Sequence, residues 1–308
     1  MKNNTRIVAG VMAVMLVIGA GTAVVHTKFS MPDSVVATSA ETLQYGSLSY
    51  EVLDNNTITI TGFDDSVTEV EIPSEIDGKP VTAIGSNAFL SKKIKSVTIP
   101  DSIISIENQA FKSCTNLTSV SIPDSVVEMG ESVFYGCTAL QSVKLSGNAS
   151  AIGQSVFNSC IGLTEITIPD GVTIIDIFAF RGCSSLEAVT IPASVASIGR
   201  ESFYNCKSLK EITIMNPNCT IGTGAITNEY SYYTGVIYGE EGSTAQAYAE
   251  SKGFTFQTID LKPKEGDING DGMVNAVDAS IISSYYAYLS TTQDEVVMNI
   301  KEFQATQQ

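Results

Sequence analysis

The sequence predicts an α/β repeat solenoid with short parallel strands on one face and short helices or turns on the other, followed by a small loop–helix unit. The first observation is a phenylalanine that recurs with one spacing of 22 residues and then four of 23. A cysteine follows each later phenylalanine by three residues, and a leucine follows each cysteine by three. The second observation is that these columns end at Leu209, and that a separate string of oxygen-bearing residues follows over residues 267–278. The recurrent phenylalanines are Phe89, Phe111, Phe134, Phe157, Phe180 and Phe203.

Each repeat reads as one structural unit. Phenylalanine, cysteine and leucine at steps of three lie on one face of a short helix or helical turn. The alternation at Ile166 and Ile168 indicates a strand of period two. Pro169 ends that strand because it has no N–H group to donate to a ladder. One unit cannot bury its apolar face alone, so stacked units are expected to share a continuous core with parallel strands side by side.

The repeat resembles bacterial leucine-rich repeats of the BspA-like type. The resemblance rests on stretches such as Leu163–Asp170 and Ile198–Cys206, and it covers about residues 45–259. It implies a curved solenoid that presents a surface to other molecules. This surface is expected on the strand residues that point outward: Thr118, Ser119, Ser121, Gln141, Ser142, Lys144, Thr164, Glu165, Thr167, Thr190, Lys210, Glu211 and Thr213. Because no aromatic ring stands among them, a glycan ligand is less favoured than a protein, and a merely solvated face remains the alternative.

Both ends of the solenoid carry atypical units. Residues 57–62 resemble an opening coil, and in the first full coil Lys92 stands where later coils have cysteine. A lysine there indicates a partly exposed terminal repeat. Residues 237–239 and 242–248 resemble a closing strand and helix. The rings expected to cover the open end of the core are Tyr230, Tyr232, Tyr233 and Tyr238.

Five of the six cysteines occupy the same repeat position. Disulfide pairing is one interpretation, and a column of buried, reduced side chains is the other. The second is favoured because each internal cysteine would have two equivalent neighbours, and five cannot pair evenly. Cys219 lies outside the column and is a candidate for exposure.

The composition argues against several classes of partner and of catalytic site. The chain has 17 Lys and Arg against 33 Asp and Glu, a net charge of −16, which argues against nucleic acid and anionic lipid as partners. Its only histidine is His26, so the rest of the chain has no Ser-His-Asp or Cys-His arrangement. Acidic residues such as Asp101, Asp124 and Asp170 follow Ile-Pro and are interpreted as turn residues. We therefore predict that the protein is not an enzyme.

The N-terminal residues indicate export. Lys2 and Arg6 precede an uncharged apolar run over residues 7–25. Residues 1–25 are predicted to be a cleaved secretory signal, with an uncleaved membrane anchor as the alternative. Residues 26–44 are polar and small, and are predicted to form a disordered leader. In either case the remainder is expected to work outside the cytoplasm, secreted or at the cell surface.

A calcium-binding loop is predicted after a linker over residues 260–265. Oxygen-bearing side chains fall at loop positions 1, 3, 5, 9 and 12 of the EF-hand scheme, and Gly272 falls at the sharp turn. Hard oxygen ligands select Ca²⁺, although an acidic turn without metal is the alternative. The predicted ligands are Asp267, Asn269, Asp271, the backbone carbonyl of Met273, Asn275 and Asp278.

Residues 266–289 resemble one repeat of a dockerin, the calcium-dependent module that attaches secreted proteins to a cohesin on a scaffoldin. The resemblance implies that Ala276 and Val277 contact the cohesin, and that Ile282 and Tyr285 either extend this contact face or pack inside the module. Dockerins normally carry two such loops, and only one is present, so residues 266–308 are interpreted as a half module with a tail. The leading hypothesis is a secreted, non-catalytic interaction protein of a cellulosome-type assembly that breaks down polysaccharide. The alternative is an adhesin for host or neighbouring-cell protein, with a purely structural calcium loop.

Overall fold

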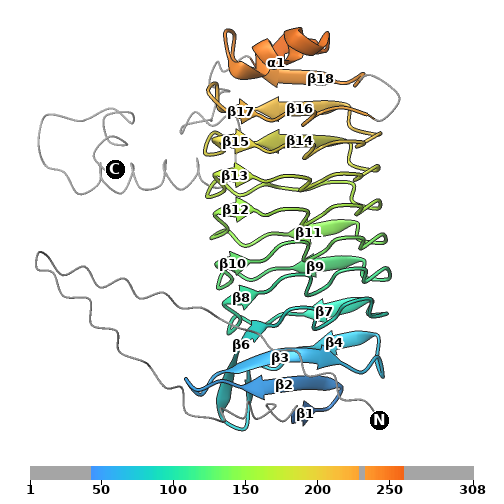
Figure 1. Ribbon diagram of the computed structural model, residues 1–308, viewed down its shortest axis with the longest axis vertical. Coiled ribbons are helices and arrows are strands. Elements are labelled where there is room, and N and C mark those ends of the chain that lie inside the picture. Colours follow the sequence, from blue (N-terminus) through green and yellow to red (C-terminus); the bar gives the residue numbers. More distant parts are fainter. Residues whose placement is uncertain (1–42, 229–232, 260–308) are drawn as a thin grey trace, which may run out of the picture. The chain divides into compact units, whose positions relative to one another are not determined.

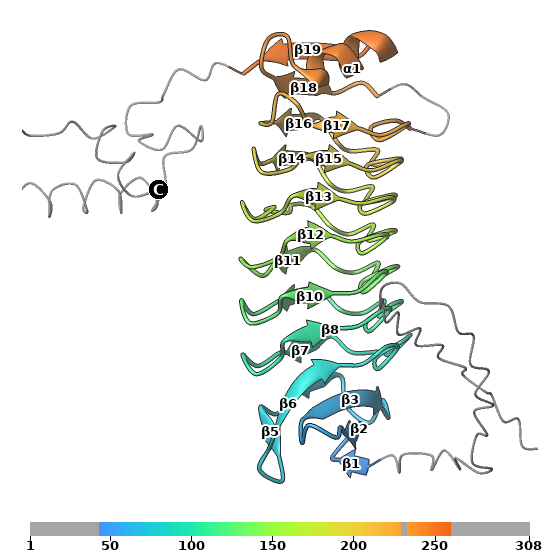
Figure 2. The same ribbon diagram turned by 60° about the vertical axis from the view of Figure 1, so that its left-hand side comes forward.

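The computed structural model describes residues 43–228 and 233–259, which form a stack of coils (Figures 1 and 2). The predicted signal, linker and calcium module lie outside the described residues, as does the predicted leader except for its last two positions. Those two, Leu43 and Gln44, already belong to the first strand. The described stack therefore agrees with the predicted solenoid and begins slightly earlier than residue 45.

One strand of most coils lies in a column that we call the first strand column. Its paired strands run parallel, and partners such as Ser119 and Ser142 are separated by one repeat length, which confirms the predicted parallel arrangement. The column consists of β4 (Glu69–Glu71), β7 (Ser96–Thr98), β9 (Ser119–Ser121), β11 (Ser142–Lys144), β14 (Ala188–Ile191), β16 (Glu211–Ile214), β18 (Val236–Gly239) and β19 (Thr255–Thr258).

A second column of short strands lies on another side of the coils (Figure 1). The repeat pattern predicts only one strand per unit, and the structure corrects this. From β6 to β8 the register joins Ala83 to Ser105, a step of 22 residues, which places the missing residue of the first full coil between them. The second strand column consists of β3 (Ile58–Phe63), β6 (Lys79–Ile84), β8 (Ser105–Ile106), β10 (Glu128–Met129), β12 (Ala151–Ile152), β13 (Ile174–Ile175), β15 (Ser197–Ile198) and β17 (Thr220–Ile221).

The segments around the repeated phenylalanines form turns rather than helices. Hydrogen bonds from the Cys114 N–H to the Phe111 carbonyl and from the Leu117 N–H to the Cys114 carbonyl each close a turn of four residues. In every repeat the second residue before and after the phenylalanine has a positive φ, as at Ser132 (56°) and Gly136 (70°). A right-handed helix cannot pass through such residues. We call these segments the turn edge: residues 86–91, 108–113, 131–136, 154–159, 177–182 and 200–205.

The phenylalanines form a continuous stack inside the solenoid. Neighbouring rings from Phe89 to Phe203 lie 5.0–5.7 Å apart between centroids, with interplanar angles of at most 13°. Phe63 of β3 extends the stack by one ring at 5.4 Å and 38°. All these rings are buried, and each coil hides its apolar side chains only against its neighbours.

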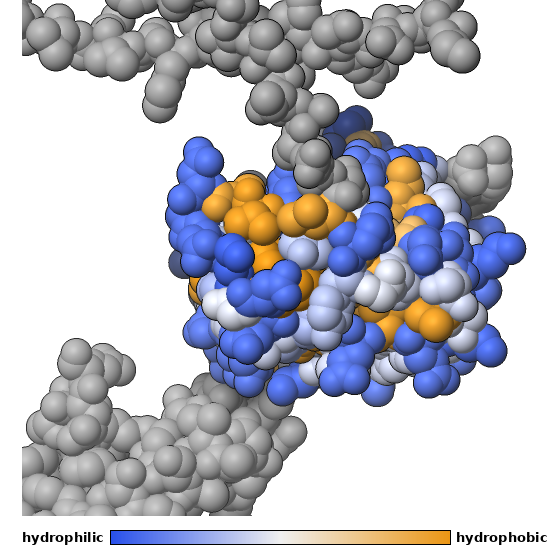
Figure 3. Space-filling view, turned by 90° about the horizontal axis from the view of Figure 1, so that it is seen from below, coloured by the Kyte–Doolittle hydropathy of each residue, from blue (hydrophilic) through white to orange (hydrophobic). Residues whose placement is uncertain are grey.

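The N-terminal end is closed by antiparallel strands. β1 (Leu43–Tyr45) pairs with β2 (Leu48–Val52), β2 pairs with β3, and β5 (Glu75–Ile76) pairs with β6. Seen from this end, apolar side chains reach the surface among hydrophilic ones (Figure 3). Exposed large apolar residues of β1, β2 and the following turn are Leu43, Tyr45, Val52 and Leu53.

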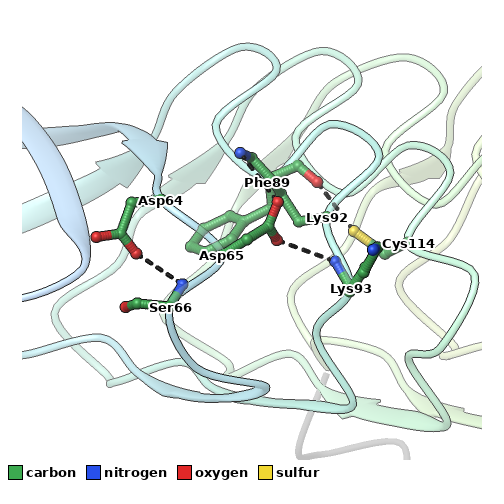
Figure 4. Close-up of polar contacts among 7 residues, drawn as sticks. All are labelled: Asp64, Asp65, Ser66, Phe89, Lys92, Lys93 and Cys114. Carbon is green, nitrogen blue, oxygen red and sulfur yellow. Dashed lines mark hydrogen bonds and ion pairs between the residues drawn. The ribbon is translucent and has the colours of Figure 1, made fainter.

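The lysine that replaces cysteine in the first coil is stabilised by an ion pair. The Lys92 Nζ lies 3.4 Å from the Asp65 Oδ2, and the Lys93 N–H donates to the Asp65 Oδ1 at 3.1 Å (Figure 4). Both Lys92 and Asp65 are partly exposed, as predicted for a terminal repeat. Nearby, the Asp64 carboxylate accepts a hydrogen bond from the Ser66 N–H, and hydrogen bonds from Ser66 lower the pKa of Asp64.

At the C-terminal end a helix covers the stack. α1 (Thr244–Lys252) begins at the Ser243 cap and ends at Gly253, whose φ is 69°. The Tyr233 ring meets Phe254 edge-on at 5.5 Å. The predicted closing strand and helix are therefore confirmed, and β19 follows them. Tyr233 covers the core as predicted, whereas Tyr230 and Tyr232 lie outside the described residues.

Candidate binding surfaces

The outward residues of the first strand column form a polar face. Along β9 the pattern is exposed, buried, exposed, because Val120 points into the core while Ser119 and Ser121 point outward. Every residue predicted for this face is exposed except Thr213, which is half-buried. The alternation of the sequence therefore identified these surface residues correctly.

Tyr238 belongs to this face rather than to the cover of the core. In the register of β16 with β18 it lies beside Thr213, while its neighbour Ile237 pairs with the buried Ile212. Its predicted place over the open end is therefore wrong. An aromatic ring thus stands at the C-terminal end of a face that is otherwise small and polar.

Charge on the strand face is sparse and partly paired. The Lys210 Nζ lies 3.1 Å from the Glu187 Oε2, and both side chains are largely exposed. A surface hollow of about 560 Å³ lies farther toward the N-terminus, where Asp101, Asp124 and Lys144 are among its lining residues. Such a hollow can receive a side chain of a partner.

The second strand column also carries a hollow, of about 520 Å³. Its lining includes Ala149 and Ser150, which are smaller than Val126 and Val127 at the same positions of the preceding coil.

The turn edge carries a cluster of arginine and aromatic side chains. The Arg200 Cζ lies 4.9 Å from the Phe178 ring centroid, and the Arg181 Cζ lies 5.4 Å from the same centroid. Arg181 also lies 5.1 Å from the Tyr204 ring. The Glu201 carboxylate is 3.7 Å from both guanidinium groups. These five residues define the arginine cluster, which the repeat pattern did not reveal, although Arg181 and Arg200 are the only arginines after Arg6.

The repeated cysteines are buried, reduced and hydrogen-bonded to the backbone. Each thiol donates to the carbonyl of the phenylalanine in the preceding coil, at 3.0–3.2 Å. Burial raises the pKa of Cys160 and of Cys206 to about 12. The favoured reduced column is confirmed, whereas the suggested exposure of Cys219 is wrong because its side chain is buried.

The predicted calcium ligands and cohesin-contacting residues all lie outside the described residues. Within residues 43–228 and 233–259, no group of three or more His, Cys, Asp or Glu side chains is placed to hold a metal ion. In the same part of the chain, no helix combines the length and apolar character needed to cross a bilayer.

Comparison with protein families decides the classification. The family described as BspA type leucine rich repeat region matches this chain over residues 82–210 and 150–237, with six copies of the repeat. Together these ranges span just over half of the chain. The chain belongs to this family. BspA-type leucine-rich repeat proteins are typically non-enzymatic binding scaffolds, and no catalytic activity is indicated for this one.

Solved leucine-rich repeat structures are similar to this BspA-type chain. A leucine-rich repeat protein from T. pallidum is 22% identical, with 70% of this chain and 98% of that one covered and a TM-score of 0.43. One from Bacteroides ovatus is 20% identical, with 71% and 76% covered and a TM-score of 0.40. A leucine rich cell surface protein from Faecalibacterium prausnitzii is 19% identical, with 57% and 95% covered and a TM-score of 0.32. Comparison with curated proteins gave no match.

Proposed function

We propose that the protein is a non-catalytic, extracellular interaction protein and that the face of the first strand column binds a partner protein. The observation that supports this most is the row of exposed polar side chains from β4 to β16. Their backbone is held by parallel pairing and by links such as the Thr164 N–H to the Gln141 carbonyl. A rigid surface loses little conformational entropy on binding.

The composition of this face favours protein over glycan. Serine and threonine side chains offer both donors and acceptors, and the hollow near Lys144 can anchor one partner side chain. Only Tyr238, at one end, offers an aromatic ring for stacking against a sugar. The family's typical role as a binding scaffold points the same way.

The experiment is an arginine scan of two separate surfaces. Ser121→Arg, Thr167→Arg and Thr190→Arg add bulk and charge to the proposed face. Ser105→Arg in the second strand column and Thr173→Arg directly before β13 serve as controls. Binding of full-length protein to a panel of purified extracellular proteins is measured by biolayer interferometry. For any partner found, the first set should weaken binding by at least about tenfold, since buried hot-spot positions cost that much.

The two control substitutions should leave binding within about twofold, because surface changes away from an interface have small effects. Equal losses from both sets would contradict the proposed face. Circular dichroism of all five variants checks that the solenoid itself remains folded.

We further propose that the loop over residues 267–278 binds Ca²⁺ and attaches the solenoid to a cohesin. The support is the sequence alone: Asp267, Asn269, Asp271, Asn275 and Asp278 occupy side-chain ligand positions of an EF-hand loop. Calorimetric titration with Ca²⁺ and capture on immobilised cohesins test this. Both are expected to be lost in Asp267→Ala plus Asp271→Ala, and capture should also be lost in EDTA. Equal capture with and without calcium would reject the attachment.

The adhesin alternative rests on the same strand face and makes the opposite prediction. If the solenoid alone binds cells, the Asp267→Ala plus Asp271→Ala variant keeps its binding to cells, while Thr167→Arg loses it. If the calcium loop mediates attachment, the pattern reverses. In both cases the apolar run over residues 7–25 supports a place outside the cytoplasm.

A further inference from the structure

The arginine cluster differs from the rest of the surface in charge. It brings two guanidinium groups against a single carboxylate, in a chain whose net charge is −16. The Arg181 and Arg200 side chains are 43% and 55% exposed, so both groups remain within reach of a partner. The cluster is therefore a local positive site on an acidic protein.

The two guanidinium groups are held in position by aromatic rings, but their N–H groups lack hydrogen-bond acceptors within the described residues. Aromatic rings hold both at cation–π distance. Their nearest carboxylate, Glu201, is 3.7 Å away, beyond the usual range of a direct hydrogen bond. Within the described residues neither arginine side chain donates a hydrogen bond to another protein group. Their N–H groups are thus available to acceptors from outside.

A strained aromatic residue supports the cluster. Phe178 has a φ of 61° and is the only aromatic residue among the described non-glycine residues with positive φ. The corresponding residues of the other coils are Asn87, Gln109, Ser132, Ser155 and Glu201. A bulky side chain costs free energy in this conformation, and such strain gathers at functional sites. Both arginines lie against the Phe178 ring, so the residue that bears the strain also positions the cations.

We propose that the arginine cluster docks carboxylate side chains of a partner polypeptide, independently of the strand face. A carboxylate matches the planar fork of each guanidinium and accepts two parallel hydrogen bonds. A sugar is disfavoured because Phe178 and Tyr204 already stack with guanidinium groups.

The test uses the full chain and a fluorescent octaglutamate peptide, read by anisotropy in about 0.15 M salt, where long-range repulsion is screened beyond roughly 8 Å. Octaglutamine is the neutral control peptide. Octaglutamate should bind and octaglutamine should not. Arg181→Gln plus Arg200→Gln should weaken the binding by about tenfold, since two charge-assisted contacts are lost. Lys93→Gln plus Lys252→Gln makes the same change in net charge near the two ends of the stack, outside both proposed surfaces, and should change affinity less than about twofold.

The Phe178→Asn variant distinguishes an effect on the position of the guanidinium groups from an effect on the stability of the fold. Asparagine tolerates positive φ, so the melting temperature should stay equal or rise, while affinity for octaglutamate falls because the guanidinium groups lose their support. No octaglutamate binding, or equal losses in the arginine and lysine pairs, would overturn the proposal. Tighter binding of polygalacturonate than of octaglutamate, lost in the same arginine variant, would also overturn it in favour of an acidic polysaccharide.

Discussion

The strand face and the turn edge are built from the same repeats but differ in how much their side chains vary from one coil to the next. On the strand face, parallel ladders fix the alternation, so outward positions repeat small polar residues such as Ser119 and Ser142. On the turn edge, Ser132 and Phe178 hold the same backbone conformation with very different side chains. The backbone of the turn edge is fixed by hydrogen bonds to the next coil, as from the Phe134 N–H to the Val156 carbonyl. The turn edge can therefore carry different side chains in different coils without disturbing the stacking of the coils.

The largest expected difference between the two surfaces concerns alkaline pH, because the thiols lie behind the turn edge. Cys160 and Cys206 have a pKa of about 12 in the folded chain, above the ordinary value of 9.0. The folded state therefore holds these protons more tightly than the unfolded state. Stability is fully present below about pH 9 and falls as the pH rises toward 12. Urea unfolding between pH 7 and 11 should show this decline.

The control for the alkaline loss is Cys160→Ala. This variant is less stable at pH 7 because it loses packing and the thiol hydrogen bond to Phe134. Its further loss between pH 9 and 11 should be smaller than that of the parent chain. Burial also raises the pKa of Tyr233 and of Tyr248, so part of the decline should remain in the variant. An unchanged pH profile in Cys160→Ala would mean that the Cys160 thiol does not contribute to the alkaline loss.

Two glycines sharpen the comparison at the junction between the second strand column and the turn edge. A Cβ on Gly199 would lie 2.6 Å from backbone atoms of Asp176 and Ile177, whereas on Gly153 its nearest neighbour would be the Val156 Cγ2 at 3.6 Å. Gly199→Ala should cost about 1–3 kcal/mol through overpacking. Gly153→Ala should change stability by less than about 0.5 kcal/mol. Chemical unfolding of both variants measures the difference, and equal costs would contradict the close packing at Gly199.

The sequence predicts the features of the fold that repeat. The phenylalanine and cysteine columns and the outward residues of β9 follow from a fixed register and from alternation. The second strand column escapes prediction because strands such as Ser105–Ile106 contain two residues, too few for a period to emerge. The turns escape because a spacing of three fits both a helix and successive turns, and only the positive φ at residues such as Ser113 distinguishes them.

Of the two candidate binding surfaces, one could be predicted from the sequence and the other could not. The strand face could be predicted because each outward residue is fixed by its own strand. The arginine cluster could not, because Arg181 and Arg200 come from neighbouring coils and meet at one ring only after stacking. The prediction for Tyr238 was wrong for a related reason. Only the pairing of β18 with β16 decides which side of the sheet this ring occupies.

The smallest expected effect lies within the turn edge, at the buried residue Ser202. Its side chain is fully buried, and its Oγ has no hydrogen-bond partner in the described part of the chain. The neighbouring coils carry Ala179 and Ala225 at this position. Ser202→Ala should therefore stabilise the fold by about 1 kcal/mol, because it removes an unsatisfied buried hydroxyl. The reverse change, Ala179→Ser, should destabilise by a similar amount. If Ser202→Ala destabilises instead, the hydroxyl has a partner, and the turn edge is held by a contact that the stacked coils do not explain.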